Sequence, residues 1–167
     1  MLKTFHIGGV HPNDNKITAD APIEVFPILD KVYISMAQHL GAPATPVVAK
    51  GDKVKVGDVI GEPAGFISGY VHASVSGTVT AVEPMKDLAG KLVMHVVIAV
   101  EGDEWRPEID RSSDIVRDIK LSKEEILDKI KLSGIVGLGG ATFPTHVKLS
   151  PPPGKKAEFL ILNGAEC

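Results

Sequence analysis

The part of this sequence whose residue types point most directly to chemistry is the glycine-rich stretch 134–148. It reads GIVGLGGATFPTHVK, so four glycines lie close together and a lysine stands at its end. Glycine has no Cβ, and backbone N–H groups in such a stretch can turn toward a ligand and approach it closely. A concave row of N–H donors suits phosphate, and the Lys148 ammonium adds a positive charge for the same anion. The stretch is therefore predicted to bind a phosphate-containing ligand.

Two common phosphate-binding motifs do not account for this stretch. A dinucleotide fingerprint G-x-G-x-x-G that starts at Gly137 would need glycine at Thr142, and it would follow a strand instead of the helix expected here. The Gly-Lys-Ser/Thr end of a P-loop is absent from the chain. Composition alone also leaves open a flexible glycine-rich connection that binds nothing.

The full string resembles the flavin-binding loop of the NADH-oxidising subunit of respiratory complex I, whose pattern is G-x-x-G-R-G-G-A-G-F-P-T-G-x-K. It is more similar still to the RnfC family of the Rnf electron-transport complex, in which the arginine is also missing. The sequence departs from the complex I pattern at Leu138, Thr142 and His146. Loss of glycine at two of these positions restricts the backbone, so the phosphate geometry is expected to differ in detail.

The resemblance implies FMN-binding residues in two places. In the loop they are Gly137, Gly139, Gly140, Ala141, Thr142 and Lys148. Further on, residues 162–166 are similar to the N-A-D-E pattern of complex I, which implies that Asn163 and Glu166 hydrogen-bond the flavin. Ala165 stands where that pattern has aspartate. Gly139 is expected to adopt a positive φ, a conformation that a β-branched residue would forbid.

Length and composition describe an ordinary soluble protein. The 167 residues suffice for one domain, or for one domain and part of another. Hydrophobic residues make up 44% and charged residues 23%, and the net charge of −3 gives no electrostatic footprint for nucleic acid. No apolar run approaches the roughly 18 residues of a membrane span, and the first residues lack a signal-peptide core. The single cysteine, Cys167, excludes an internal disulfide and fits a reducing cytoplasm.

The chain divides into three predicted parts. Residues 1–29 form an extended N-terminal arm, residues 30–105 a β-domain, and residues 106–167 a linker, a helix, the glycine-rich loop and the first strand of a truncated FMN/NADH-binding domain. The two histidines of the arm, His6 and His11, are interpreted as structural or exposed because no nearby acidic residue or cysteine completes a metal site. The first residues of the arm, FHIGGVHP, also resemble the beginning of RnfC proteins.

The β-domain is predicted from turns and alternating apolar residues. Two Gly-Asp steps, at 51–52 and 57–58, flank alternating valines and predict turns around a half-buried strand. Residues 71–82 predict a strand, a Ser76-Gly77 turn and a second strand. The clearest strand has one buried face of alternate residues, namely Leu92, Met94, Val96, Ile98 and Val100.

Two motifs in this region, VxxGDxI and SGTVxxV, resemble the barrel-sandwich hybrid of biotinyl and lipoyl carrier domains. In those carriers a lysine at the hairpin tip between the motifs takes the cofactor, but here residues 62–69 contain no lysine, and Lys86 follows the second motif. We therefore expect neither biotin nor lipoyl, and we interpret His72 and His95 as structural and not as ligands. The predicted fold is mainly β, a barrel-sandwich hybrid followed by the incomplete start of an α/β domain that binds FMN and NADH.

The remaining elements of the third part follow from local signals. Ser122 and Glu125 form a capping box, and the apolar stripe after them predicts a helix that ends before Gly134. Residues 157–163 predict a buried parallel strand. Because such a strand needs neighbours that the sequence does not supply, the chain is expected to be an N-terminal fragment of a longer protein.

The resemblance implies a peripheral subunit of a membrane-bound, ion-translocating ferredoxin:NAD oxidoreductase, on the cytoplasmic side of the inner membrane. Its partners would be the other Rnf subunits, NADH and, indirectly, ferredoxin. The full-length protein would use FMN and NADH, and 4Fe–4S clusters are expected only downstream because they need closely spaced cysteines. The fragment by itself is expected to be inactive and to bind FMN weakly or not at all. Two alternatives stay open: a non-catalytic assembly or docking module, and a subunit similar to cobalamin reductase, which shares the glycine loop.

Overall fold

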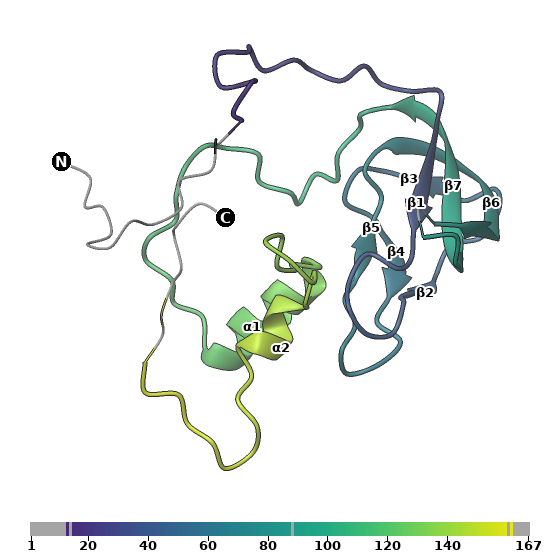
Figure 1. Ribbon diagram of the computed structural model, residues 1–167. Coiled ribbons are helices and arrows are strands. Elements are labelled where there is room, and N and C mark those ends of the chain that lie inside the picture. Colours follow the sequence, from purple (N-terminus) through teal and green to yellow (C-terminus); the bar gives the residue numbers. More distant parts are fainter. Residues whose placement is uncertain (1–12, 14, 88, 160, 162–167) are drawn as a thin grey trace.

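The computed structural model describes residues 13, 15–87, 89–159 and 161 (Figure 1). The strands are β1 (Lys31–Ser35), β2 (Thr45–Pro46), β3 (Lys53–Val54), β4 (Val59–Glu62), β5 (Val71–His72), β6 (Ser76–Lys86) and β7 (Leu92–Gly102), and the helices are α1 (Lys123–Leu132) and α2 (Thr145–Lys148). Every one of these strands lies within the predicted β-domain. The described part of the chain is therefore mainly β, as the sequence predicts.

The strands form two antiparallel sheets that enclose one core. One sheet has the order β1-β7-β6-β3 and the other the order β2-β4-β5. The core takes side chains from both sheets, so it lies between them; its fully buried members are Met36, Ile60, Val79, Val96 and Ile98. Burial of such aliphatic side chains is worth about 1.5–3 kcal/mol each, which makes this interface the main source of the domain's stability.

Strand β7 confirms the predicted buried face at its centre and adds a second one, but Leu92, at the start of the strand, is 63% exposed, so its predicted burial is wrong. Val96 and Ile98 have no exposed surface, as the alternation predicts. On the opposite face, however, Val93, His95 and Val97 are also buried. The reason is that β7 is an inner strand with β1 and β6 on its two sides, so cross-strand neighbours cover its outer face as well.

Both Gly-Asp steps are turns, as predicted. Gly51 and Gly57 adopt φ values of +100° and +89°, which a residue with a side chain rarely adopts. The Asp52 carboxylate accepts a hydrogen bond of 2.7 Å from the Ala49 amide, and the Asp58 carboxylate accepts one of 2.6 Å from the Lys55 amide. The aspartates thus close the turns that the glycines permit.

The predicted Ser76-Gly77 turn is wrong. These residues begin strand β6, where the pairing with β7 shifts register at a bulge. A Cβ on Gly77 would lie 2.0 Å from the carbonyl oxygen of Ala99, so glycine is required here by the close approach of β7 and not by a turn.

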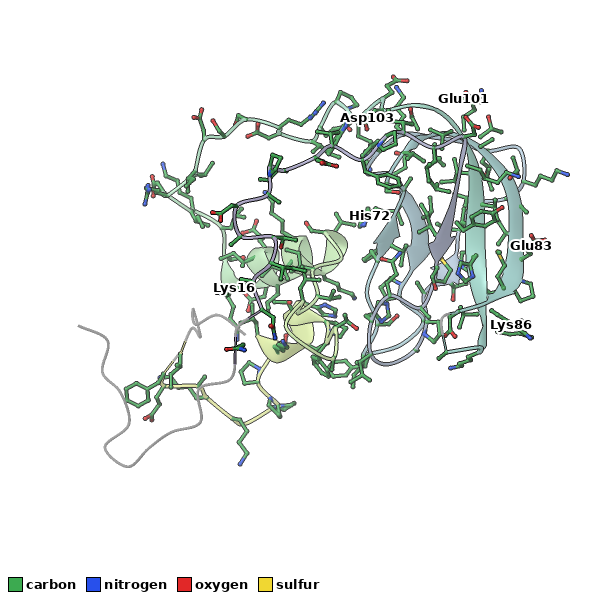
Figure 2. The ribbon with its side chains drawn as sticks, turned by 45° about the horizontal axis from the view of Figure 1, so that its top comes forward. Lys16, His72, Glu83, Lys86, Glu101 and Asp103 are labelled. Carbon is green, nitrogen blue, oxygen red and sulfur yellow. The ribbon has the colours of Figure 1, made fainter. Side chains whose placement is uncertain are left out.

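The hairpin tip between β4 and β5 is tied to the segment that follows β1. Ser68 Oγ donates a hydrogen bond of 2.8 Å to the Ala42 carbonyl, and the Ala42 amide donates one of 3.0 Å to Ile67. Carrier domains place their modified lysine at this tip. In this chain the tip has no lysine, and Lys86 is the last residue of β6, on the side of the domain away from His72 (Figure 2).

Helix α1 begins at the predicted capping box. Ser122 Oγ accepts a hydrogen bond of 3.3 Å from the Glu125 amide, and the Glu125 carboxylate accepts one of 2.7 Å from the Ser122 amide. The helix ends at Leu132, and Gly134 follows it with a φ of +65°, which is typical of the residue just past a helix C-terminus. None of the residues of α1 is buried, and no described helix is long and apolar enough to cross a membrane.

The predicted parallel strand at 157–163 is absent from its described residues, 157–159 and 161. They form no strand, and Phe159 and Ile161 are 85% and 88% exposed. A strand exists only through hydrogen bonds to a neighbouring strand, and no described strand lies beside this segment.

Candidate functional site

Two backbone hydrogen bonds close the base of the glycine-rich loop. The Gly137 amide donates to the Phe143 carbonyl at 3.0 Å, and the Thr145 amide donates to the Ile135 carbonyl at 2.9 Å. Pro144, which lies between these two hydrogen bonds, is fully buried. Residues 138–142 therefore form a tip on a fixed base, which distinguishes the loop from an unstructured connection.

The tip presents open backbone. Residues 138–141 are exposed, and within the described residues the amides of Leu138 and Gly139 have no hydrogen-bond partner. A Cβ on Gly139 or Gly140 would meet no atom within 4 Å. The φ of Gly139 lies outside the left-handed region, so the expected positive φ is wrong. Glycine here leaves space next to the backbone, and the chain's own conformation does not require it.

Thr142 ends the tip in the left-handed conformation, with φ of +49°. For a β-branched residue this conformation costs about 1–2 kcal/mol. Its carbonyl accepts a hydrogen bond of 3.3 Å from the Leu40 amide, and its hydroxyl donates one of 2.7 Å to the Ala141 carbonyl. The threonine thus holds a backbone shape that glycine would adopt without strain.

Lys148 lies directly beside the base of the tip. Its Nζ is 2.7 Å from the position that a Cβ on Gly137 would occupy, so any larger residue at 137 would displace the ammonium group. In the described part of the chain no carboxylate lies within ion-pair distance of Lys148. The stretch 134–148 itself contains no acidic residue. A positive charge and unpaired N–H donors therefore occur together, which is the donor set that a phosphate group needs.

The surroundings of His146 disfavour the charged form of its imidazole. Partial burial lowers the pKa of its imidazole, and the positive charge of Lys131 and the nearby His39 lower it further. A phosphate bound nearby would act in the opposite direction and raise this pKa. From the sequence, His146 was noted only as a departure from the complex I pattern. Its lowered pKa could not be predicted because Lys131 and His39 are not close to it along the chain.

A set of contacts that we call the junction joins the loop to the β-domain. It comprises Leu40, Tyr70 and His72 on the β-domain side and Leu132, Gly134 and Thr142 on the loop side. A Cβ on Gly134 would lie 2.5 Å from the Tyr70 carbonyl oxygen. Burial lowers the pKa of His72, although a hydrogen bond to the Leu132 carbonyl opposes that effect. Figure 2 shows His72 on the side of the β-domain that faces the helices.

The two histidines of the β-domain contact other parts of the protein. The His72 ring lies 3.4 Å from the position that a Cβ on Gly134 would occupy, and His95 Nδ1 lies 3.0 Å from the Val93 carbonyl oxygen. Among the described residues no group of three histidine, cysteine, aspartate or glutamate side chains is placed to hold a metal ion. The predicted flavin ligands Asn163 and Glu166, like His6 and His11, lie outside the described residues.

Comparison with known proteins places two family signatures on the chain. Residues 3–103 match the RnfC barrel sandwich hybrid domain, and residues 130–167 match the Nuo51 FMN-binding domain. The first match confirms the predicted barrel-sandwich hybrid. The second begins within α1 and includes the whole glycine-rich loop.

Similar curated proteins include the C subunits of several oxidoreductase complexes. The one from the proton-translocating ferredoxin:NAD(+) oxidoreductase complex of Clostridium ljungdahlii is 50% identical over 170 residues, which cover 100% of this chain and 36% of that protein. The Na(+)-translocating counterpart of Acetobacterium woodii is 48% identical, over 96% of this chain and 36% of the relative. The one from the ion-translocating oxidoreductase complex of Rhodobacter capsulatus is 37% identical, over 99% of this chain and 32% of the relative. The chain thus spans about a third of the length of these relatives.

Proposed function

The chain belongs to the RnfC family through its barrel sandwich hybrid domain, and from this premise we propose that its glycine-rich loop binds the phosphate of FMN in the RnfC component of a ferredoxin:NAD⁺ oxidoreductase complex. The observation that carries the proposal is the pairing of open backbone at residues 138–141 with the Lys148 ammonium at the base of the same tip. The match of residues 130–167 to an FMN-binding domain supports the same ligand.

The residues present fit a phosphate group. Unpaired amides at Leu138 and Gly139 supply donors, the two glycines of the tip leave room for close approach, and Lys148 supplies the charge. By resemblance, Asn163 and Glu166 would hydrogen-bond the flavin itself. FMN, when bound, would supply the chemistry that takes a hydride from NADH and passes electrons on singly. The chain's own residues would bind and orient it, and no general acid or base from this chain is needed.

The rest of the electron path would belong to the longer protein and its complex. Iron–sulfur clusters need several cysteines, and this chain has one, so the 4Fe–4S clusters would be held elsewhere in the longer protein. Ferredoxin would exchange electrons through other parts of the complex. The protein would sit peripherally on the cytoplasmic side of the membrane, in contact with the other Rnf subunits. The names of the relatives, which are subunits of a complex, support the contact with other subunits.

The test is an FMN titration of the natural full-length protein, followed by flavin fluorescence. Gly139→Val should abolish binding because its side chain would occupy the space left beside the tip amides. Lys148→Ala should weaken binding about ten- to a hundredfold, since one charge-assisted hydrogen bond to the phosphate is worth about 1.5–3 kcal/mol.

Two matched variants control this experiment. Gly65 is an exposed glycine without a positive φ, like Gly139, but it lies at the β4–β5 tip, so Gly65→Val should leave FMN binding unchanged. Lys155→Ala removes an exposed lysine outside the loop and should also have no effect. Undiminished binding by the Gly139 variant would mean that the loop is only a connection.

A docking role is the second candidate, and one observation favours it. The arm carries apolar side chains that nothing in the described residues covers; Ile23 is 100% exposed, Val25 93% and Phe26 76%. Such a run is typical of a segment that lies on a larger surface. Wild-type full-length protein that binds no FMN but assembles with the other subunits would favour this role.

A further inference from the structure

We propose that the β-domain positions the glycine-rich loop, with Gly134, His72 and Leu40 as the positioning residues of the junction. This inference deepens the proposed function and rests on it for the identity of the ligand. The barrel-sandwich hybrid is then more than a docking module, because it holds the loop in the shape that presents its amides.

Helix α1 by itself does not anchor the loop. None of its residues is buried and only Ile126, Leu127 and Ile130 are partly covered, so the helix has no fully buried face that would fix where its C-terminal end lies. The loop follows this end directly. Its position therefore depends on contacts that the loop and the helix end make with the β-domain (Figure 1).

Gly134 makes the closest of these contacts. A Cβ at this residue would lie 2.5 Å from the Tyr70 carbonyl oxygen and 3.4 Å from two atoms of the His72 ring. Its φ of +65° also belongs to the left-handed region. Glycine is thus required twice, once to end the helix and once to let the chain lie against β5.

His72 reaches across the same contact to the helix end. The carbonyl of Leu132 is one of the last carbonyls of α1, which have no partner within the helix. Burial lowers the pKa of the His72 imidazole, and this carbonyl acts on the ring in the opposite direction. The ring is partly buried, so this interaction is partly shielded from water. This side chain therefore ties β5 to the last turn of the helix.

Leu40 holds the far side of the loop. Its amide donates to the Thr142 carbonyl at 3.3 Å, at the residue where the tip turns left-handed. The neighbouring His39 Nε2 accepts a hydrogen bond of 3.0 Å from the Gly69 amide, which links this anchor to the segment that carries Tyr70. Both anchors of the loop thus belong to one connected piece of the β-domain.

Such anchoring matters for affinity because a loop that is already in its binding shape loses less conformational freedom when the ligand arrives. Loosening the junction should weaken ligand binding without removing any group that touches the ligand. It should also speed amide exchange in the loop when no ligand is present, since exchange reports local opening.

The variant that tests the proposal is Gly134→Ala in the natural full-length protein. Its matched control is Gly154→Ala, because Gly154 has a similar φ of +78° but no atom within 4 Å of its Cβ position. Both variants carry the same backbone cost, and only the first disturbs the junction. Amide exchange without FMN is measured by mass spectrometry, and FMN affinity by fluorescence titration.

Gly134→Ala should exchange at least about tenfold faster over 134–148 and bind FMN at least about tenfold more weakly, with β7 exchange unchanged. Gly154→Ala should match wild type in both measurements. Wild-type exchange in the loop of the Gly134 variant would overturn the proposal, and so would faster exchange with unchanged FMN affinity. If wild type binds no FMN, the proposed function fails, and the exchange measurement alone then decides this inference.

A second pair of variants keeps the proposal testable if Gly134→Ala does not fold. His72→Leu keeps a side chain of similar bulk but removes the donor to Leu132, so it should reproduce faster loop exchange. His72→Gln keeps an N–H donor and should restore most of the protection. Equal exchange rates in these two variants would show that the hydrogen bond does not position the loop.

Discussion

Replacement of Val96 by aspartate tests the assignment of the core. Val96 has no exposed surface and lies opposite Ile34 on β1 and Val82 on β6. The substitution removes about 1.5–3 kcal/mol of valine burial. A carboxyl group kept neutral in the core at pH 7 costs a further 4 kcal/mol or so, because its pKa in the unfolded chain is about 3.9 and each pH unit corresponds to about 1.36 kcal/mol.

The sum, about 6 kcal/mol, is comparable to the total stability of a typical domain, about 5–15 kcal/mol. Val96→Asp should therefore be largely unfolded or melt far below wild type, as measured by urea denaturation and circular dichroism. The matched control is Leu92→Asp, on the same face of the same strand but 63% exposed, which should cost little.

The pH dependence separates this mechanism from a simple packing defect. As the pH falls toward about 4, the cost of neutralising the carboxyl disappears, so the difference between the two variants should shrink to about 2 kcal/mol. A Val96 variant as stable as the Leu92 variant at pH 7 would refute the core assignment. A difference that does not change with pH would refute the charge mechanism.

Two further predictions concern modification and pH. No lysine of this chain should be biotinylated or lipoylated after co-expression with the ligases, because the β4–β5 tip has none; a mass increase matching either cofactor on Lys86 in intact-mass analysis would contradict this. The junction should weaken in acid. Burial lowers the pKa of His72, with Arg106 contributing, and burial together with Lys131 and His39 lowers that of His146. An opened junction would therefore bind more protons, so protection of the loop should be complete above the ordinary value of 6.5 and decline as pH falls below it. Intrinsically corrected amide exchange at about pH 5 and about pH 7.5 measures this, and equal protection at both would contradict it.

Much of the fold could be predicted because its signals are local. Each Gly-Asp turn needs only a glycine with positive φ and an aspartate whose carboxylate accepts a hydrogen bond from the amide three residues before it. Both lie within one short segment. The capping box at Ser122 and Glu125 is likewise complete within four residues. The resemblance of the glycine-rich loop to a flavin loop also rests on adjacent residues, as the match of residues 130–167 confirms.

Other features depend on which segments meet, and local patterns do not encode this. Gly77 is needed because the Ala99 carbonyl on β7 approaches it, so a pattern that is typical of a turn proved to be a strand. The run at 157–163 has the composition of a buried strand, yet its described residues form none because no described strand pairs with them.

The site divides in the same way. The residue types of the loop by themselves led to the proposal of a phosphate site, since glycines and a lysine supply donors and charge wherever they lie. Only the tertiary structure decided that Lys148 folds over Gly137 and that the Tyr70 carbonyl and His72 lie against Gly134. These contacts join residues far apart in the chain, and their geometry follows from how the β-domain and the helix end pack. Residue types therefore decide which groups of the loop can donate hydrogen bonds, whereas the packing of the β-domain against the helix end decides where these groups lie.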